Sequence, residues 1–265
     1  MVDLQHRFGG IQRLYGLEAF EIITQANICI VGIGGVGTWV AEALARSGVG
    51  RITLIDMDDV CETNINRQLV ALDSTVEEAK VDVMAARIAD INPACQCQVI
   101  EDFIGPNNLA EYLDQGFDYV IDACDSIKAK ASMIYWCKRN KVPVLTIGGA
   151  GGQKDPSKIL VGDLAFTQAD PLAAKLRSTL RRHYGFSDNK KRKFGVDCVY
   201  SLEQLVYPHP DGSVCQAKHE NVAGAKMDCS RGFGAVSFVT GSFAFVAVSR
   251  VLEKHIARVQ RRAHA

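Results

Sequence analysis

The sequence predicts an α/β fold, a doubly wound and mostly parallel Rossmann-like sheet with an antiparallel C-terminal extension and helices. Short apolar runs alternate with helical stretches over residues 27–152, which is typical of a parallel sheet built from βαβ units. The first run leads into Gly32-x-Gly34-Gly35-x-Gly37, the glycine spacing of a nucleotide-binding unit. Beyond Gly152 this alternation stops.

The composition is that of a globular protein in a reducing compartment. Hydrophobic residues make up 48% and charged residues 23% of the 265 residues, enough for a large core. Thirty basic and thirty acidic residues cancel, so the net charge indicates no partner. The start of the chain lacks the apolar stretch of a secretory signal, and the nine cysteines include no CxxC pair. We therefore expect a cytoplasmic protein without a disulfide framework or structural zinc.

We expect a single domain with four segments. Residues 1–26 form an N-terminal helical arm, and residues 27–152 form the Rossmann-like core. Residues 153–234 form a basic substrate region, and residues 235–265 form an apolar helix with a basic tail.

The first βαβ unit predicts a nucleotide site. Residues 28–31 are apolar and indicate a buried parallel strand, residues 36–47 a helix, and residues 52–55 a second strand that ends in Asp56. Glycines let a backbone approach a phosphate, and the helix N-terminus offers unpaired N–H groups. An acid about 20 positions after the glycines meets a ribose hydroxyl.

The alternation continues through the core. Helices are expected over residues 80–91, 107–115 and 127–140, and strands over 97–100, 119–125 and 142–147. Like Asp56, Asp125 ends a predicted parallel strand, so both carboxylates are expected at the ligand-binding edge of the sheet.

The last third of the chain has a different pattern. Residues 159–166 and 199–205 predict antiparallel strands around a basic helix over residues 173–183, and residues 208–230 predict a loop. Residues 235–252 are apolar nearly all round, but contain serines, Arg250 and small residues. We expect a buried helix at a domain or subunit interface, and the alternative is a membrane anchor.

Five motifs in this order resemble the E1-like superfamily of adenylating enzymes, which includes the ThiF- and MoeB-type activators of sulfur-carrier proteins. They are the glycine loop, Ile55-Asp56-Met57-Asp58, Asn64-Ile65-Asn66-Arg67-Gln68, Lys80 within EAKVD, and Asp122-Ala123-Cys124-Asp125. The resemblance covers residues 7–152, with a weaker likeness in the C-terminal helix. It implies a ligase-like enzyme that joins a carboxylate to the α-phosphate of ATP with Mg²⁺.

The chain resembles most the branch that uses ATP to cyclise N6-threonylcarbamoyladenosine beside the anticodon of tRNA. It lacks the paired CxxC of the sulfur-carrier activators, its arm reads RFGGIQRLYG over residues 7–16, and Arg231-Gly232-Phe233-Gly234 precedes the last helix. The resemblance implies a homodimer that acts on tRNA and not on DNA, with a link to a cysteine desulfurase and sulfur-acceptor system.

The resemblance also implies site residues. The positions along the nucleotide are Gly32, Gly34, Gly35, Gly37, Asp56, Asp58, Asn64 and Gln68. The catalytic positions are Arg67 and Lys80 on the β- and γ-phosphates, Asp125 on Mg²⁺, and an arginine from the partner subunit. The altered spacing of the arm leaves Arg13 and Arg7 both open for that last role.

A basic cluster predicts the nucleic-acid contact. It consists of Lys175, Arg177, Arg181, Arg182, Lys190, Lys191, Arg192 and Lys193, with Tyr184 and Phe186 interleaved. Basic runs are often only solvated, but attraction to a phosphate backbone is the most direct use of this one.

Two other functions compete with tRNA modification. An activator of a ubiquitin-like carrier protein would use Cys198 covalently, although a buried structural thiol is the simpler interpretation of that residue. A non-catalytic nucleotide- or NAD-binding module would have no need of Arg67, Lys80 and Asp125.

Overall fold

One seven-stranded sheet organises the computed structural model, which describes residues 3–209, 211–216 and 233–264. Its order is β3-β2-β1-β4-β5-β7-β6. The strands are β1 Asn27–Val31, β2 Arg51–Ile55, β3 Gln96–Ile100, β4 Tyr119–Asp122, β5 Val144–Ile147, β6 Ile159–Asp163 and β7 Asp197–Ser201. Neighbouring strands are parallel, except that β6 runs antiparallel to β7. The predicted fold class is confirmed.

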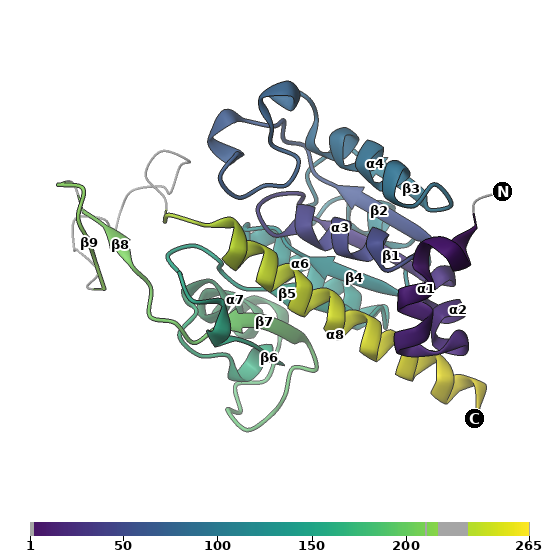
Figure 1. Ribbon diagram of the computed structural model, residues 1–265. Coiled ribbons are helices and arrows are strands. Elements are labelled where there is room, and N and C mark those ends of the chain that lie inside the picture. Colours follow the sequence, from purple (N-terminus) through teal and green to yellow (C-terminus); the bar gives the residue numbers. More distant parts are fainter. Residues whose placement is uncertain (1–2, 210, 217–232, 265) are drawn as a thin grey trace.

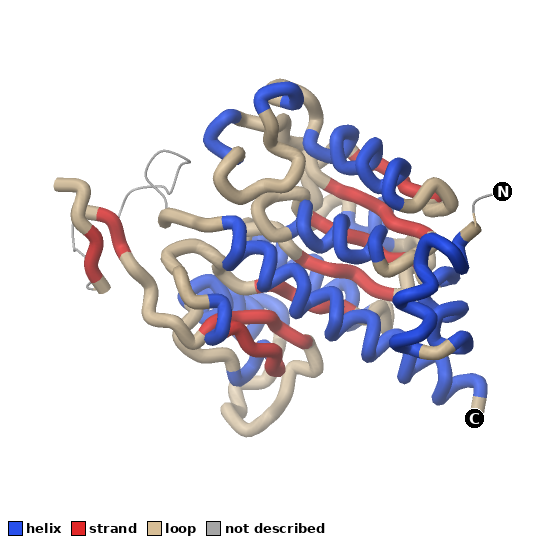
Figure 2. The backbone as a smooth tube through the Cα atoms, viewed as in Figure 1, coloured by secondary structure: helices blue, strands red, loops and turns tan. Residues whose placement is uncertain are grey.

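Helices cover both faces of this sheet. They are α1 Leu4–Tyr15, α2 Leu17–Gln25, α3 Gly37–Arg46, α4 Lys80–Ile91, α5 Leu109–Leu113, α6 Ile127–Arg139, α7 Pro171–Tyr184 and α8 Ser237–Ala263. Figure 1 shows α3, α4 and α8 on one face, with α6 and α7 on the other. The layers are also clear when helices and strands are coloured apart (Figure 2).

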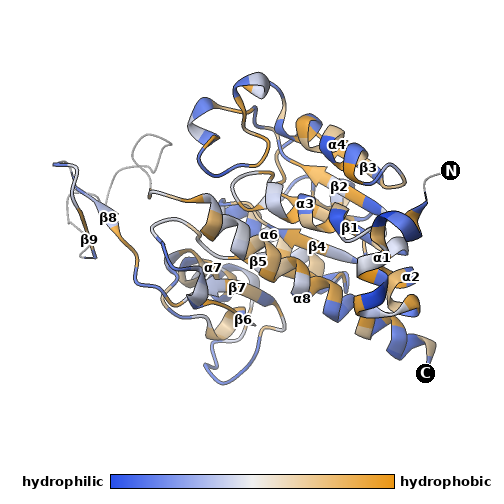
Figure 3. Ribbon diagram, viewed as in Figure 1, coloured by the Kyte–Doolittle hydropathy of each residue, from blue (hydrophilic) through white to orange (hydrophobic). Residues whose placement is uncertain are grey.

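Each face of the sheet has its own apolar core. In β1, Ile28 and Ile30 join the cluster under α3 and α8, whereas Cys29 and Val31 join the cluster under α6 and α7. Successive side chains of a strand point to opposite faces, so a strand buried on both sides is apolar throughout. Figure 3 shows this as orange strands between two-toned helices.

The strand order predicts a ligand-binding position at one edge of the sheet. The chain runs from β1 to β2 and β3 in one direction, then returns to β4 on the other side of β1. The loops after β1 and β4 therefore leave the same edge towards opposite faces, which is where open α/β sheets bind ligands.

Two strand predictions in the last third of the chain were wrong in their bounds. The strand expected over residues 199–205 is β7, which ends at Ser201, because Glu203 accepts the N–H groups of Lys154 and Asp155 at 2.8–3.1 Å and turns the chain away. The other ends at Asp163 instead of residue 166 and is followed by a short 3-10 helix. β7 is antiparallel to β6 but parallel to β5.

The last helix is longer than expected. α8 spans 27 residues and takes in the predicted basic tail, while it buries Val239, Phe243 and Val251 against the core. In the part of the chain that the structure describes, no helix is long and apolar enough to cross a membrane. At the start of the region expected to be a loop, residues 208–230, β8 Tyr207–Pro208 pairs with β9 Val214–Cys215. Arg231 and Gly232 lie outside the described residues.

Candidate nucleotide site

Asp56 ties the glycine loop to the end of β2. One carboxylate oxygen accepts the N–H of Ile33 at 2.5 Å, and the other accepts the N–H of Asp58 at 2.9 Å. Each oxygen keeps a lone pair for a further donor, such as a ribose hydroxyl. The predicted nucleotide acid therefore also fixes the backbone that leads into the loop.

The four glycines of the loop are required for different structural reasons. Gly32 has a φ of 91°, and an added Cβ would lie 2.8 Å from the backbone nitrogen of Cys124. At Gly37 an added Cβ would lie 1.8 Å from the carbonyl oxygen of Gly32. These two allow strand, helix and the loop after β4 to meet. An added Cβ at Gly34 would meet nothing within 4 Å, so the backbone there is open to a ligand.

Arg67 stands beside this open backbone. An added Cβ at Gly35 would contact its side chain at 3.4 Å. Its guanidinium donates to the carbonyl of Thr63 at 2.8 Å and to the side-chain oxygen of Asn66 at 3.1 Å. Its carbonyl accepts the indole N–H of Trp39 at 3.0 Å and the hydroxyl of Thr240 at 3.4 Å. The loop after β2 thus holds the guanidinium, while α3 and α8 hold the backbone of Arg67.

Lys80 is a buried cation at the first position of α4. Its residue is 5% exposed, and its ammonium lies 2.8 Å from the carboxylate of Asp58, a side chain that is 57% exposed. A lysine is rarely buried unless it is paired. The pair lies at the same edge of the sheet as the glycine loop, because Asp58 follows β2.

Asn64 and Gln68 differ in how their amides are used. Asn64 accepts the N–H of Cys61 at 3.2 Å, so its side-chain oxygen closes the local turn. The side-chain oxygen of Gln68 is buried and has no hydrogen-bond partner among the described residues. A buried acceptor without a donor is costly. A nucleotide with hydroxyl and amino donors fits this position.

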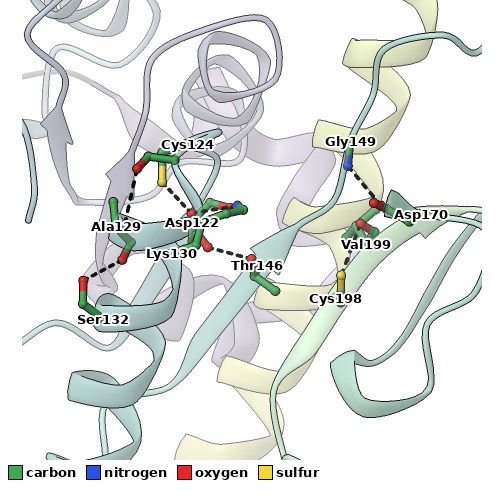
Figure 4. Close-up of polar contacts among 11 residues, drawn as sticks. Asp122, Cys124, Ala129, Lys130, Ser132, Thr146, Gly149, Asp170, Cys198 and Val199 are labelled. Carbon is green, nitrogen blue, oxygen red and sulfur yellow. Dashed lines mark hydrogen bonds and ion pairs between the residues drawn. The ribbon is translucent and has the colours of Figure 1, made fainter. Parts of the chain in front are cut away.

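The acid at the end of β4 is Asp122 and not Asp125, and Figure 4 shows Asp122 among its polar partners. Asp122 is fully buried. It accepts the Lys130 ammonium at 2.9 Å, the Thr146 hydroxyl at 2.6 Å and the Cys124 thiol at 3.1 Å. The expectation that Asp125 ends a strand was wrong, because these contacts stop β4 three residues earlier.

Asp125 lies exposed in the loop between β4 and α6. There it remains at the carboxyl edge of the sheet, free to bind a cation at the crevice. Among the described residues, three or more His, Cys, Asp or Glu side chains nowhere gather as a metal cage. Mg²⁺ often takes only one or two carboxylates together with phosphate oxygens, and Asp125 fits that role.

The sequence interpretation missed Lys130. Its burial alone would lower its pKa, but the neighbouring Asp122 carboxylate raises the pKa of Lys130 above its ordinary value, so the ammonium stays charged. The sequence did contain a signal for this ion pair. Lys130 lies in a predicted helix, eight residues after an acid in an apolar strand.

Asp170 connects the loop after β5 to the basic helix α7. One carboxylate oxygen accepts the N–H of Gly149 at 3.0 Å (Figure 4). The other caps α7 by accepting the N–H of Ala173 at 2.9 Å. An added Cβ at Gly148 would lie 1.9 Å from this carboxylate. Burial raises the pKa of Asp170, against the effect of these backbone bonds.

Cys198 is a structural thiol. It lies inside β7, is 1% exposed, and its pKa is raised by burial first and by Asp170 second. A thiol that stays protonated out of reach of solvent is not a nucleophile. The covalent role expected for Cys198 in a carrier-protein activator therefore has no support from its surroundings.

The two arginines of the arm differ. Arg7 donates to the carbonyls of Asp90 and Ile91 at 3.2 and 2.8 Å and so caps the end of α4. Arg13 is exposed. α1 lies at the amino ends of the strands (Figure 1), and β1 alone separates the two edges by roughly 16 Å. Arg13 cannot reach the site of its own chain.

The basic cluster lies on α7 and the loop after it. Arg177 and Arg181 are half-buried, while the remaining members are exposed: Lys175, Arg182, Lys190, Lys191, Arg192 and Lys193. The interleaved aromatics face inwards. Tyr184 packs on Tyr135 and Phe186 on Phe194, with ring centroids 5.1 and 4.9 Å apart.

Comparison with known proteins identifies the family of this chain. The profile of the ThiF family matches residues 10–256. The chain belongs to the ThiF family. It is 56% identical over 257 residues to the tRNA threonylcarbamoyladenosine dehydratase of Escherichia coli strain K12, covering 97% of this chain and 96% of that protein. Identity to the enzyme of that name from Haemophilus influenzae is 53% over 252 residues, covering 95% and 94%.

A solved ThiF-family structure has the same fold. The crystal structure of the E. coli dehydratase in complex with ATP matches with a TM-score of 0.87 at 52% identity, covering 97% of this chain and 96% of that one. The resemblance to E1-like adenylating enzymes is thereby confirmed.

Proposed function

We propose that this protein is an ATP-dependent dehydratase that cyclises N6-threonylcarbamoyladenosine in tRNA. The main support is that the likeness to the E. coli dehydratase spans the nucleotide core and the basic region alike, at 56% identity over 97% of the chain. The chain is an enzyme of the ThiF type, and we place it among the ligases because it would join the carboxylate to AMP.

The crevice residues have clear tasks in this reaction. Arg67 and Lys80 bring two cations to a site where two anions must meet, the triphosphate and the threonyl carboxylate. The open backbone at Gly34 lies against the phosphates, and Asp56 binds the ribose. Bound Mg²⁺, held by Asp125, would add positive charge at the phosphates.

The chemistry needs no nucleophile from the protein. A carboxylate oxygen of the threonyl group attacks the α-phosphorus of ATP, and pyrophosphate leaves. The carbamoyl nitrogen or oxygen of the same substituent then attacks the acyl carbon. A carbamoyl N–H gives up its proton in either case, and AMP leaves with the former carboxylate oxygen. Because both groups belong to one nucleoside, ring closure is intramolecular and benefits from a high effective concentration. The buried state of Cys198 is consistent with this route.

We further propose a homodimer in which Arg13 enters the site of the partner subunit. The support is that Arg13 is exposed but lies at the wrong edge of its own sheet. A stripe on α8 also exposes Phe238 and Phe245 by 56% and 51%, seven residues apart on one face of the helix. Large exposed aromatics in one stripe are typical of an interface.

Two further proposals concern the location and a protein partner. We propose a cytoplasmic location, where the tRNA substrate is found. A cysteine desulfurase and sulfur-acceptor system is proposed on the resemblance alone; binding between the purified proteins would test it.

Turnover of labelled ATP tests the function. We expect AMP and pyrophosphate in the presence of tRNA from cells that lack this gene, and a loss of one water from one adenosine derivative in the tRNA nucleosides. The variants Asp56→Ala and Asp125→Ala should lose this activity. Turnover with a small carrier protein but not with tRNA would favour the activator, and no turnover with either would favour the non-catalytic module.

A further inference from the structure

A hollow on α7 gathers three arginines. It has a cavity volume of about 350 Å³ and is lined by Ala174, Arg177, Ser178, Arg181, Arg182 and Asp188. Three positive side chains and one negative side chain therefore share one small space, which gives the hollow an excess of positive charge.

Two of the three guanidinium groups are held in fixed positions. Arg177 donates to the hydroxyl of Thr167. Arg181 donates to the carbonyl of Ser187 at 3.2 Å and lies 5.3 Å from the ring centroid of Phe194. Because these contacts use only part of each planar guanidinium, the remaining N–H donors stay available.

This arrangement of arginines lowers the stability of the protein when no anion is bound. Arg177 and Arg181 are like charges four residues apart on one helix, a spacing that destabilises a helix. Burial, and then the charge of Arg181, lower the pKa of Arg177. Within residues 3–209, 211–216 and 233–264, no carboxylate lies within 4 Å of any of the three guanidinium groups. A bound anion would remove this repulsion.

We propose that this hollow, the Arg177–Arg181–Arg182 pocket, binds one phosphodiester group of the tRNA backbone. The proposal rests on the proposed function and adds a division of labour to it. Guanidinium groups match phosphate oxygens in paired, directional hydrogen bonds. A second group of cations is exposed and carried on flexible side chains: Lys190, Lys191, Arg192 and Lys193. These charges attract the RNA backbone without fixing its register.

The position of the pocket gives it a second role. Asp170 binds Gly149 at the catalytic edge and caps α7. Arg177 and Arg181 follow it along the helix, roughly 10 and 16 Å away at about 1.5 Å per residue. A phosphate bound there lies roughly three to five stacked nucleotides from that edge. The pocket therefore sets the register that brings one modified adenosine to the ATP.

The decisive test keeps the charge and changes the geometry. The affinity of the full-length protein for bulk tRNA is measured at several salt concentrations for wild type, Arg181→Lys, Arg182→Gln, Lys191→Gln and Arg262→Gln. We expect R181K to weaken tRNA binding about tenfold with an unchanged salt slope, since lysine cannot form the paired bonds. K191Q should lower the salt slope by about one but weaken binding only about threefold near physiological salt.

Two controls separate folding from binding. R262Q removes an exposed arginine at the far end of α8 and should bind tRNA as wild type does. R181K must retain wild-type ATP affinity and thermal melting; if it does not, R182Q decides, because Arg182 is exposed. R182Q should weaken tRNA binding at least fivefold.

Three results would overturn the pocket. One is wild-type tRNA affinity in R181K and R182Q. Another is a loss of affinity no larger than that of K191Q. The third is weaker binding of an acidic carrier protein with unchanged tRNA affinity. The proposed function fails separately, if wild-type protein releases no AMP with tRNA; the pocket fails alone if wild type releases AMP with tRNA and the variants match it.

Discussion

The buried pair of Asp122 and Lys130 offers a quantitative test of how the catalytic edge is built. Both residues are fully buried, and their charged atoms lie 2.9 Å apart. Lys130→Met removes the cation but leaves the carboxylate with only the Thr146 hydroxyl and the Cys124 thiol as side-chain partners. Asp122→Asn removes the anion and leaves the ammonium buried.

The expected magnitudes follow from desolvation. Breaking a buried pair by removing one partner costs about 3–5 kcal/mol, since the remaining charge stays out of water. The double variant Lys130→Met, Asp122→Asn carries neither charge, and its amide oxygen can still accept the Thr146 hydroxyl. It should lose only about 1–2 kcal/mol. The coupling free energy between the two positions should thus exceed about 3 kcal/mol.

Urea unfolding at neutral pH measures these free energies. The matched control is Lys128→Gln, an exposed lysine on the same helix, which should change the free energy of unfolding by less than about 0.5 kcal/mol. ATP affinity provides a second measurement, because Asp122 fixes the turn that carries Asp125. Additive single-variant effects, or a Lys130→Met cost near that of the control, would refute the reasoning.

Three further predictions concern single groups. Mixing Arg13→Ala and Asp125→Ala subunits, each inactive alone, should restore about a quarter of wild-type AMP release, since half of the dimers would have one complete site; no recovery would exclude an arginine in trans. Cys198→Ala should keep AMP release within about twofold while costing about 1 kcal/mol of stability, and an inactive but folded variant would restore the thiol to the mechanism. Burial lowers the pKa of His255, so the folded protein should lose stability as pH falls below about 6.5. His255→Gln should flatten the unfolding free energy between about pH 7.5 and 5.5, and an unchanged pH dependence would contradict this.

Local patterns were enough for the first half of the fold. The glycine loop, the acid after β2 and the start of α4 at Lys80 follow from periodicity and from contacts close in sequence. The sequence also placed Asp56 at the ligand-binding edge, because parallel strands end on the same side, whereas Arg67 and Lys80 came from the family resemblance. Their roles with ATP remain predictions.

Contacts between distant segments explain what the sequence could not reveal. The end of β4 depends on Lys130 and on Thr146 of β5, so Asp125 was assigned to the wrong element. The parallel pairing of β7 with β5 depends on the crossover through α7. The choice between Arg7 and Arg13 needed the observation that Arg7 caps α4.

The anchoring of Arg67 by α8 has a consequence for biosynthesis. The carbonyl of Arg67 takes one donor from Trp39, early in the chain, and another from Thr240, close to its end. Asn66 likewise donates to the carbonyl of Ala235 at 2.8 Å. The ribosome must therefore have released nearly the whole polypeptide before the loop that carries Arg67 acquires its final shape. A nascent chain that has already formed its first strands would still be unable to use ATP.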